Sequence, residues 1–183
     1  IGYSFTPLSW SVQAYEYVFQ LGDALWRSYF NSFLITIVGT VVSVTICVLY
    51  AYPLLRQDYR LRGFFSFLSF FTMIFGGGLI PTYIGCKNLL GMSNNYAALI
   101  VPMLVSPFNI IIMRTFFQTS VPFDLIEAAT IDGSGEYTTL VRIILPIVKP
   151  GIATVALLTA LGYWNEWFLC LLYVTKRELY PLQ

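Results

Sequence analysis

Residues 119–150 carry a group of charged side chains in a largely apolar chain. The ionisable side chains there include Asp124, Glu127, Asp132, Glu136 and Arg142. So many charges cannot cross a lipid bilayer, which indicates that the segment lies in water beside one. Charge pairing and docking are the chemistry open to these groups. The chain has no histidine, which removes the commonest general base and metal ligand.

A short helix is predicted at the start of this segment. Pro122 suits the first turn of a helix, and Asp124 places negative charge where the helix dipole favours it. Residues 124–131 are rich in strong helix formers. Gly133 fits the left-handed position that ends a helix.

A second short helix is predicted beyond the bend at residues 132–135. Ser134 can cap it, with Glu136 in its first turn, and we expect it to end before Pro146. From the residues alone, three roles stay open for the two helices. They are passive packing beneath a bundle, docking of a soluble partner, and binding of lipid headgroups, against which the acidic balance counts.

A second candidate group lies near the end of the last apolar run. Its members are Tyr163, Trp164, Asn165, Glu166 and Trp167. Aromatic faces pack against the C–H faces of sugar rings, and Asn or Glu can bond hydroxyl groups, so these residues are candidates for a substrate path. The alternative is an interfacial aromatic belt with Glu166 reaching water. Weaker candidates are Asn31, Asn109 and Arg114. Of these, Arg114 is expected to mark the inner interface between the membrane and water.

Composition places the chain in a membrane. Charged residues make up 10% of it, against roughly 25% in soluble domains, so there is too little polar surface to face water. The net charge of +1 provides no basic field for nucleic acid. Three cysteines have spacings that match no metal site.

Four apolar runs are long enough to span the hydrocarbon core, at residues 28–55, 63–86, 96–117 and 147–174. They are continuous rather than alternating, which favours helices over a barrel. The predicted fold class is therefore all-α, a polytopic helical membrane protein. Glycine and proline interrupt the second and third runs, at 76–78, 81, 102 and 107. Such breaks are kinks in packed helices or part of a pathway.

Arginines in the short links predict the orientation. Arg56, Arg60 and Arg62 place their link in the cytoplasm, and the alternation of spans then places residues 119–146 there as well. Residues 1–26, 87–95 and 175–183 are expected outside. The whole of 1–183 is expected to be one transmembrane domain and a piece of a longer subunit.

The charged segment resembles the EAA loop of bacterial binding-protein-dependent ABC importers. The matching positions are Glu127, Ala128, Ala129, Gly133, Ile143, Leu145 and Pro146, with Asp132 and Pro150 typical of the carbohydrate-uptake branch. The stretches YFNSFLITIVGT, GGLIPTY, YWNEWF and YPLQ are similar to maltose-type permeases, and most of all to the complex-sugar and polysaccharide subgroup. The resemblance implies a type I importer fold, with the second to fifth of six spans present.

The resemblance also implies partners and a place in the cell. The first helix of such a loop seats in a cleft on a cytoplasmic ABC ATPase dimer, which holds ATP and Mg. Glu127 would supply a charge, Ala128 and Ala129 a close approach, and Gly133 the bend. A second, non-identical permease and a solute-binding protein complete the importer in the bacterial cytoplasmic (inner) membrane. No GxxxxGK[ST] stretch occurs, so no cofactor is expected on this chain.

Other functions remain open at this point. An importer of amino acids or phosphonate would share the loop, and a secondary transporter or channel would share the spans. A membrane enzyme has the least support, because no Ser/His, Cys/His or paired-carboxylate arrangement is visible.

Overall fold

The computed structural model describes residue 12 and residues 22–183, and all regular structure in these residues is helical. The longest helix is α2 (Asp23–Leu55), with 33 residues. Its interior from Ser28 onward has no charge, and Arg56 follows directly after its end. Among the helices of the described residues, it alone is long and apolar enough to cross a membrane unbroken. Of the predicted external segment 1–26, residues 1–11 and 13–21 lie outside the described residues.

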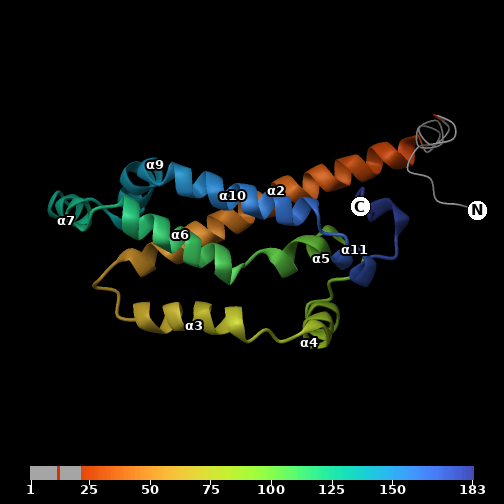
Figure 1. The fold of residues 1–183 in the computed structure, drawn as a ribbon, viewed down its shortest axis with the longest axis horizontal. Coiled ribbons are helices and arrows are strands. Elements are labelled where there is room, and N and C mark those ends of the chain that lie inside the picture. Colours follow the sequence, from red (N-terminus) through yellow and green to blue (C-terminus); the bar gives the residue numbers. More distant parts are fainter. Residues whose placement is uncertain (1–11, 13–21) are drawn as a thin grey trace, which may run out of the picture.

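The remaining helices are shorter than α2, and sharp bends separate several of them (Figure 1). Those before the charged segment are α3 (Arg62–Ile74), α4 (Leu79–Ile84), the π-helical turn η1 (Gly85–Leu89), α5 (Tyr96–Ile100), the 3₁₀ turn η2 (Val101–Met103) and α6 (Pro107–Ser120). Those within and after it are α7 (Phe123–Ile131), α8 (Glu136–Thr138), the π-helical turn η3 (Thr139–Ile144), α9 (Leu145–Ile147), α10 (Lys149–Trp164), α11 (Phe168–Tyr173) and the 3₁₀ turn η4 (Arg177–Leu179).

Bent helix pairs replace the other predicted spans. The axes of α3 and the α4–η1 pair differ by 112°, and those of the α5–η2 pair and α6 by 52°. Gly78, with φ 81°, lies at the first break. Pro107 begins α6 after the second. If each bent pair counts as one crossing, up to four helical spans are present.

The last predicted span, 147–174, differs most from the structure. The α8–α9 arm meets α10 at 81°, so Ile147 belongs to the arm and the long helix begins at Lys149. A second break follows Trp164, where α10 ends and the separate α11 starts at Phe168. The break is stabilised locally, because a Glu166 oxygen accepts a hydrogen bond from the Leu169 backbone N–H at 2.9 Å.

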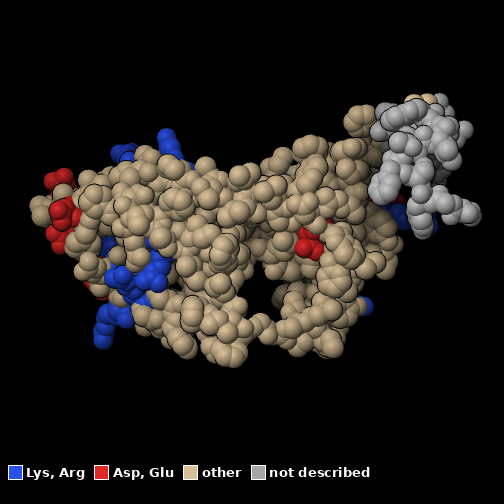
Figure 2. Space-filling model, viewed as in Figure 1, with Lys and Arg blue, Asp and Glu red and all other residues tan. Residues whose placement is uncertain are grey.

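The two ends of the bundle differ in charge. Residues 56–62, α7 and α8 gather at one end, here named the charged end, whereas α4, α5 and α11 lie at the opposite end (Figure 1). Lys, Arg, Asp and Glu side chains cluster at the charged end, and the bodies of α6 and α10 present an apolar band (Figure 2). The bundle therefore has the outline of a protein that crosses a bilayer along its long axis.

Helix α2 packs against both α10 and α6 and forms the centre of the bundle. Buried side chains form two clusters, one near the charged end around Met113, Phe117 and Val148, the other near the opposite end around Leu99 and Tyr163. Buried polar groups also join the helices. The Ser43 hydroxyl donates to the Leu104 carbonyl at 2.8 Å, and the Asn109 amide donates to the Thr159 hydroxyl at 3.1 Å. Such bonds stabilise helix pairs in lipid.

Close contact between α2 and α10 depends on the missing side chain of Gly39. A Cβ at this position would lie 2.6 Å from Tyr163 Cζ. The ring has little freedom to move away, because its hydroxyl donates to the Ile100 carbonyl at 2.9 Å.

We therefore expect Gly39→Ala to lower the free energy of unfolding by about 1–3 kcal/mol through overpacking. Thermal unfolding of the purified protein in detergent measures the change. Gly63→Ala is the matched control, because nothing lies within 4 Å of a Cβ there. Equal melting temperatures for the two variants would contradict this account of the α2–α10 contact.

Candidate functional site: the coupling segment

Helix α7 has one face anchored to the bundle and one face open. Ile126 and Ala129 are buried, whereas Glu127 and Ala128 are exposed. Ile131, at its end, is 85% exposed. The helix begins at Phe123, one residue later than predicted, because Pro122 has extended backbone and stands before the first turn. The open face therefore offers a carboxylate, a small side chain and an apolar tip.

The bend after α7 is a Schellman motif built on Gly133. The N–H of Gly133 bonds to the Thr130 carbonyl at 3.1 Å, and that of Ser134 to the Ala129 carbonyl at 2.9 Å. Gly133 has φ 74°, so the predicted left-handed helix end is confirmed. Asp132 precedes the glycine and is exposed. The bend turns the chain back toward the bundle.

Two predictions for the second helix are wrong. Ser134 does not cap it, because Gly135 occupies the capping position and the Ser134 hydroxyl instead accepts a bond from the Thr139 hydroxyl at 3.2 Å. The helical arm also continues past Pro146, through η3 into α9. Pro146 lies in the first turn of α9, directly after the π-helical turn η3.

The eight predicted coupling residues fall into three places. Glu127, Ala128 and Ala129 are on α7, and Asp132 and Gly133 form the bend. Ile143, Leu145 and Pro146 lie at the far end of the arm, directly before α10. Leu145 packs against the buried cluster at the charged end. The segment is thus a hairpin of two helical arms, one carrying the open face and the other continuous with a long helix.

Tyr52 and Arg56 hold this hairpin by bonding Glu136, and the sequence did not predict this role for either residue. Both oxygens of Glu136 are engaged by the end of α2: Tyr52 Oη donates to Oε2 at 2.6 Å, and Arg56 Nη2 pairs with Oε1 at 3.0 Å. Arg56 also bonds both oxygens of Asp58 at 3.2 Å. These bonds lower the pKa of the Asp58 carboxyl below its usual value. Arg56 entered the sequence argument only as a marker of orientation.

A groove of about 370 Å³ runs beside α7. Its walls come from Phe123, Ile126, Glu127 and Thr130 on one side and from Arg56 and Asp58 on the other. Glu127 therefore faces an open, mixed-charge depression at the charged end of the bundle. A larger groove of about 950 Å³ lies on the other side of Arg56, next to Tyr52 and Glu136.

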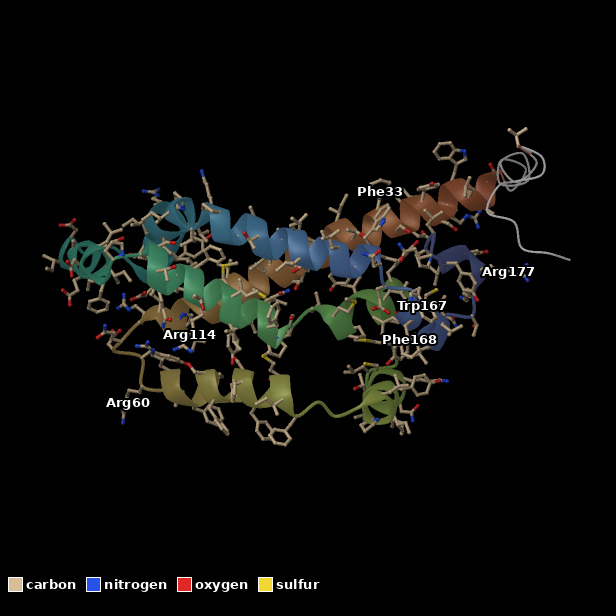
Figure 3. All side chains as sticks on the ribbon, in the orientation of Figure 1. Phe33, Arg60, Arg114, Trp167, Phe168 and Arg177 are labelled. Atoms are coloured by element: carbon tan, nitrogen blue, oxygen red, sulfur yellow. The ribbon has the colours of Figure 1, made fainter. Side chains whose placement is uncertain are left out.

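The predicted substrate-path residues do not form one cluster. Tyr163 is buried, and Trp164 packs edge-on against Phe33 with ring centroids 5.3 Å apart. Asn165 bonds back to the Leu161 carbonyl. Trp167, beyond the break, is exposed and stacks edge-on with Phe168 at the opposite end of the bundle (Figure 3).

A very small cavity joins three members of this group. It measures about 10 Å³ and is lined by Tyr163, Trp164 and Glu166, with Ser32 and Pro181 above them. That volume holds at most a single water molecule. This cavity is therefore too small for a sugar ring.

The weaker candidates have structural partners or an interfacial place. The Asn31 amide donates to the Glu178 and Tyr180 carbonyls at 2.8 and 3.2 Å, and its oxygen accepts from Tyr96. Arg114 lies on α6 on the side facing α3 (Figure 3). Its Nε is buried without a hydrogen-bond partner in the described part of the chain. Across residues 12 and 22–183, no group of His, Cys, Asp and Glu is arranged to hold a metal ion.

Comparison with known proteins now decides the family. The family model for the binding-protein-dependent transport system inner membrane component matches residues 38–176, which include every element from the middle of α2 to α11. The chain belongs to this family. The match contains the whole hairpin and both residues that hold it.

Individual relatives agree with this assignment. The chain is 44% identical to Protein LplC of Bacillus subtilis over 97% of its own length and 59% of that protein's. It is 40% identical to the polygalacturonan/rhamnogalacturonan transport system permease protein YtcP of Bacillus subtilis, over 97% of its length and 61% of the relative's. This family member thus spans about three fifths of the curated relatives it matches.

A solved structure has the same fold. The crystal structure of a bacterial ABC transporter involved in the import of the acidic polysaccharide alginate contains a chain that matches with a TM-score of 0.90 and 33% identity. The match covers 100% of this chain and 65% of the other. The all-α importer permease fold expected from the sequence is confirmed.

The Schellman bend supplies a test of the hairpin. Gly133 and Gly135 both have open space at Cβ, but only Gly133 has a positive φ. Gly133→Ala should therefore destabilise the bend by about 1–2 kcal/mol, while Gly135→Ala leaves it intact. Amide hydrogen exchange over residues 130–136 measures the difference. Similar exchange in both variants would rule out a backbone role specific to Gly133.

Proposed function

We propose that this chain is the membrane-spanning permease subunit of an ATP-driven, binding-protein-dependent importer of sugars or oligosaccharides. The observation that supports it most is the open face of α7, held out from the charged end of a family-typical bundle. The similarity to LplC, YtcP and the alginate importer supports membership of the family. The names of YtcP and of the alginate importer refer to the transport of polysaccharides. Complex sugars are the substrate class that we propose here.

The open face of α7 suits a cleft on an ATPase partner. Ala128 is small and exposed, so a cleft wall can approach the helix backbone closely. Glu127 supplies a charge for an Arg or Lys of that partner, and the exposed Ile131 supplies apolar area. ATP and Mg would be held by the partner dimer. Its closure on ATP would draw two such helices together and shift the bundle between two states.

Further partners follow from the outer surfaces of the bundle. Phe64, Phe67 and Phe70 on α3 are exposed, which fits contact with lipid tails or with a second, non-identical permease subunit. The opposite end of the bundle would face the solute-binding protein. The location that we propose is the bacterial cytoplasmic membrane, with residues 56–62 and 119–146 on the cytoplasmic side.

Blocking the open face of α7 tests the docking role. In the assembled importer, Ala128→Trp should prevent the ATPase subunit from copurifying, because the indole fills the space that a cleft wall would occupy. Ala153→Trp is the control, since Ala153 is also exposed but lies on α10. Solute uptake by the Ala128→Trp variant at the wild-type rate, without a bound ATPase, would indicate a secondary transporter or channel instead.

Trp26 and Trp167, both exposed, allow substrate contact to be separated from interfacial anchoring. Trp167 belongs to the predicted substrate path, whereas Trp26 lies in the first turn of α2, and both are more than half exposed. Trp167→Ala should reduce oligosaccharide uptake, because it removes a ring that stacks on the sugar, and should leave ATPase docking unchanged. Trp26→Ala is the control and should take up oligosaccharide at close to the wild-type rate. Equal uptake in all three proteins would leave Trp167 as part of an aromatic belt.

A further inference from the structure

The polar connection between the hairpin and the rest of the bundle is concentrated at Glu136. One oxygen of its carboxylate accepts from Tyr52 Oη at 2.6 Å, and the other pairs with Arg56 Nη2 at 3.0 Å. Tyr52 and Arg56 are four residues apart, at the last turn of α2 and directly after it, so they face the same side. We call this three-residue group the Glu136 clamp.

Helix α7 has no comparable connection of its own. In the described residues, its side chains form no hydrogen bond or ion pair with another element, and the Thr130 hydroxyl bonds only to the Ile126 carbonyl of the same helix. Its contact with the bundle is apolar, through buried Ile126 and Ala129. Apolar contacts have little directionality, whereas a carboxylate held at both oxygens has a defined position.

The clamp joins the hairpin to the central helix. Helix α2 packs along α10 and α6, so a displacement at its end bears on most of the bundle. The second arm of the hairpin already continues into α10 through the chain. With the clamp closed, a movement of the bend therefore reaches two neighbouring long helices together rather than α10 alone.

Arg56 has a second acceptor, which allows the clamp to open. Asp58 accepts from Nε and Nη2 of Arg56 at 3.2 Å, so the guanidinium, whose side chain is 16% exposed, keeps a counter-charge when Glu136 withdraws. The Glu136 side chain is 62% exposed and can return to water. Opening thus leaves no buried charge unpaired.

We propose that Tyr52 and Arg56 are positioning residues that transmit displacement of the hairpin to α2 by holding Glu136, and that the clamp is a coupling element of the importer. This rests on the proposed function. Because exposed ion pairs add little to folding stability, the role of the clamp is in transmission. Its loss separates ATP hydrolysis from transport without unfolding the protein.

Three variants of the assembled importer in proteoliposomes test this proposal. Arg56→Gln and Tyr52→Phe should retain the ATPase subunit on copurification, yet transport fewer solute molecules per ATP hydrolysed, by a factor of about five or more for a typical coupling free energy. Arg56→Lys keeps the ion pair and should restore most of the ratio. Arg60→Gln, in the same link but without an ion pair in the described residues, is the control and should match the wild type.

Two outcomes would overturn the proposal. An unchanged transport-to-ATP ratio in Arg56→Gln and Tyr52→Phe would show that the clamp transmits nothing. Loss of the ATPase subunit from both variants would show that the clamp only shapes the docking surface.

A measurement on the chain without partners separates this proposal from the proposed function. Amide hydrogen exchange over residues 136–140 should be faster in Arg56→Gln and unchanged in Arg60→Gln, whether or not the wild type transports sugar. Unchanged exchange in Arg56→Gln would overturn the clamp even where ATP-driven transport is confirmed.

Discussion

Hydrogen bonding of the backbone in a bilayer is the constraint on which this structure depends. Lipid tails offer no partner for an N–H or C=O group, so every interruption of a helix must be satisfied within the protein. Helix α2 avoids the problem by running without a break for 33 residues. At three interruptions elsewhere, a side chain accepts from a free N–H: Asn95 from Ala98, Ser106 from Asn109, and Glu166 from Leu169.

This constraint accounts for the hydrogen bond that Glu166 makes in the structure. The sequence offers two roles for Glu166, a group that bonds sugar hydroxyls in a substrate path or a side chain that reaches water from an interfacial belt. In the structure its carboxylate caps α11 and lines a cavity of about 10 Å³. The hydrogen bond stabilises the broken helix, and the place of Glu166 in a substrate path stays a prediction.

In water, free backbone N–H and C=O groups can bond to solvent, and charged side chains can form the contacts between segments. The hairpin made by α7, the Gly133 bend and the second arm combines a helix end satisfied by its own backbone with an exposed face at Glu127 and Ala128. Its connection to α2 is polar and partly exposed at Glu136, whereas its connection to α10 is covalent. The hairpin is therefore connected to two long helices of the bundle, to one by side-chain bonds and to the other by the chain itself.

Local chemistry made much of this predictable from the sequence alone. Low charge and long apolar runs determined the membrane environment and the helical class, and the Gly-rich and Pro-containing breaks predicted two of the bends. The left-handed position of Gly133 and the helix before it followed from residues within one turn of each other. Such signals are short-range, and no distant contact is needed to interpret them.

Only the tertiary structure decided which side chains meet. Tyr52 and Glu136 are 84 residues apart, and Asn31 binds a carbonyl 149 residues away. In a membrane helix the faces toward lipid and toward the core are both apolar, so hydrophobic periodicity does not tell them apart. The register of α2 against α10, and with it the clamp at Glu136 and the separation of Tyr163 from Trp167, depends on close approaches such as that of Gly39 to the Tyr163 ring.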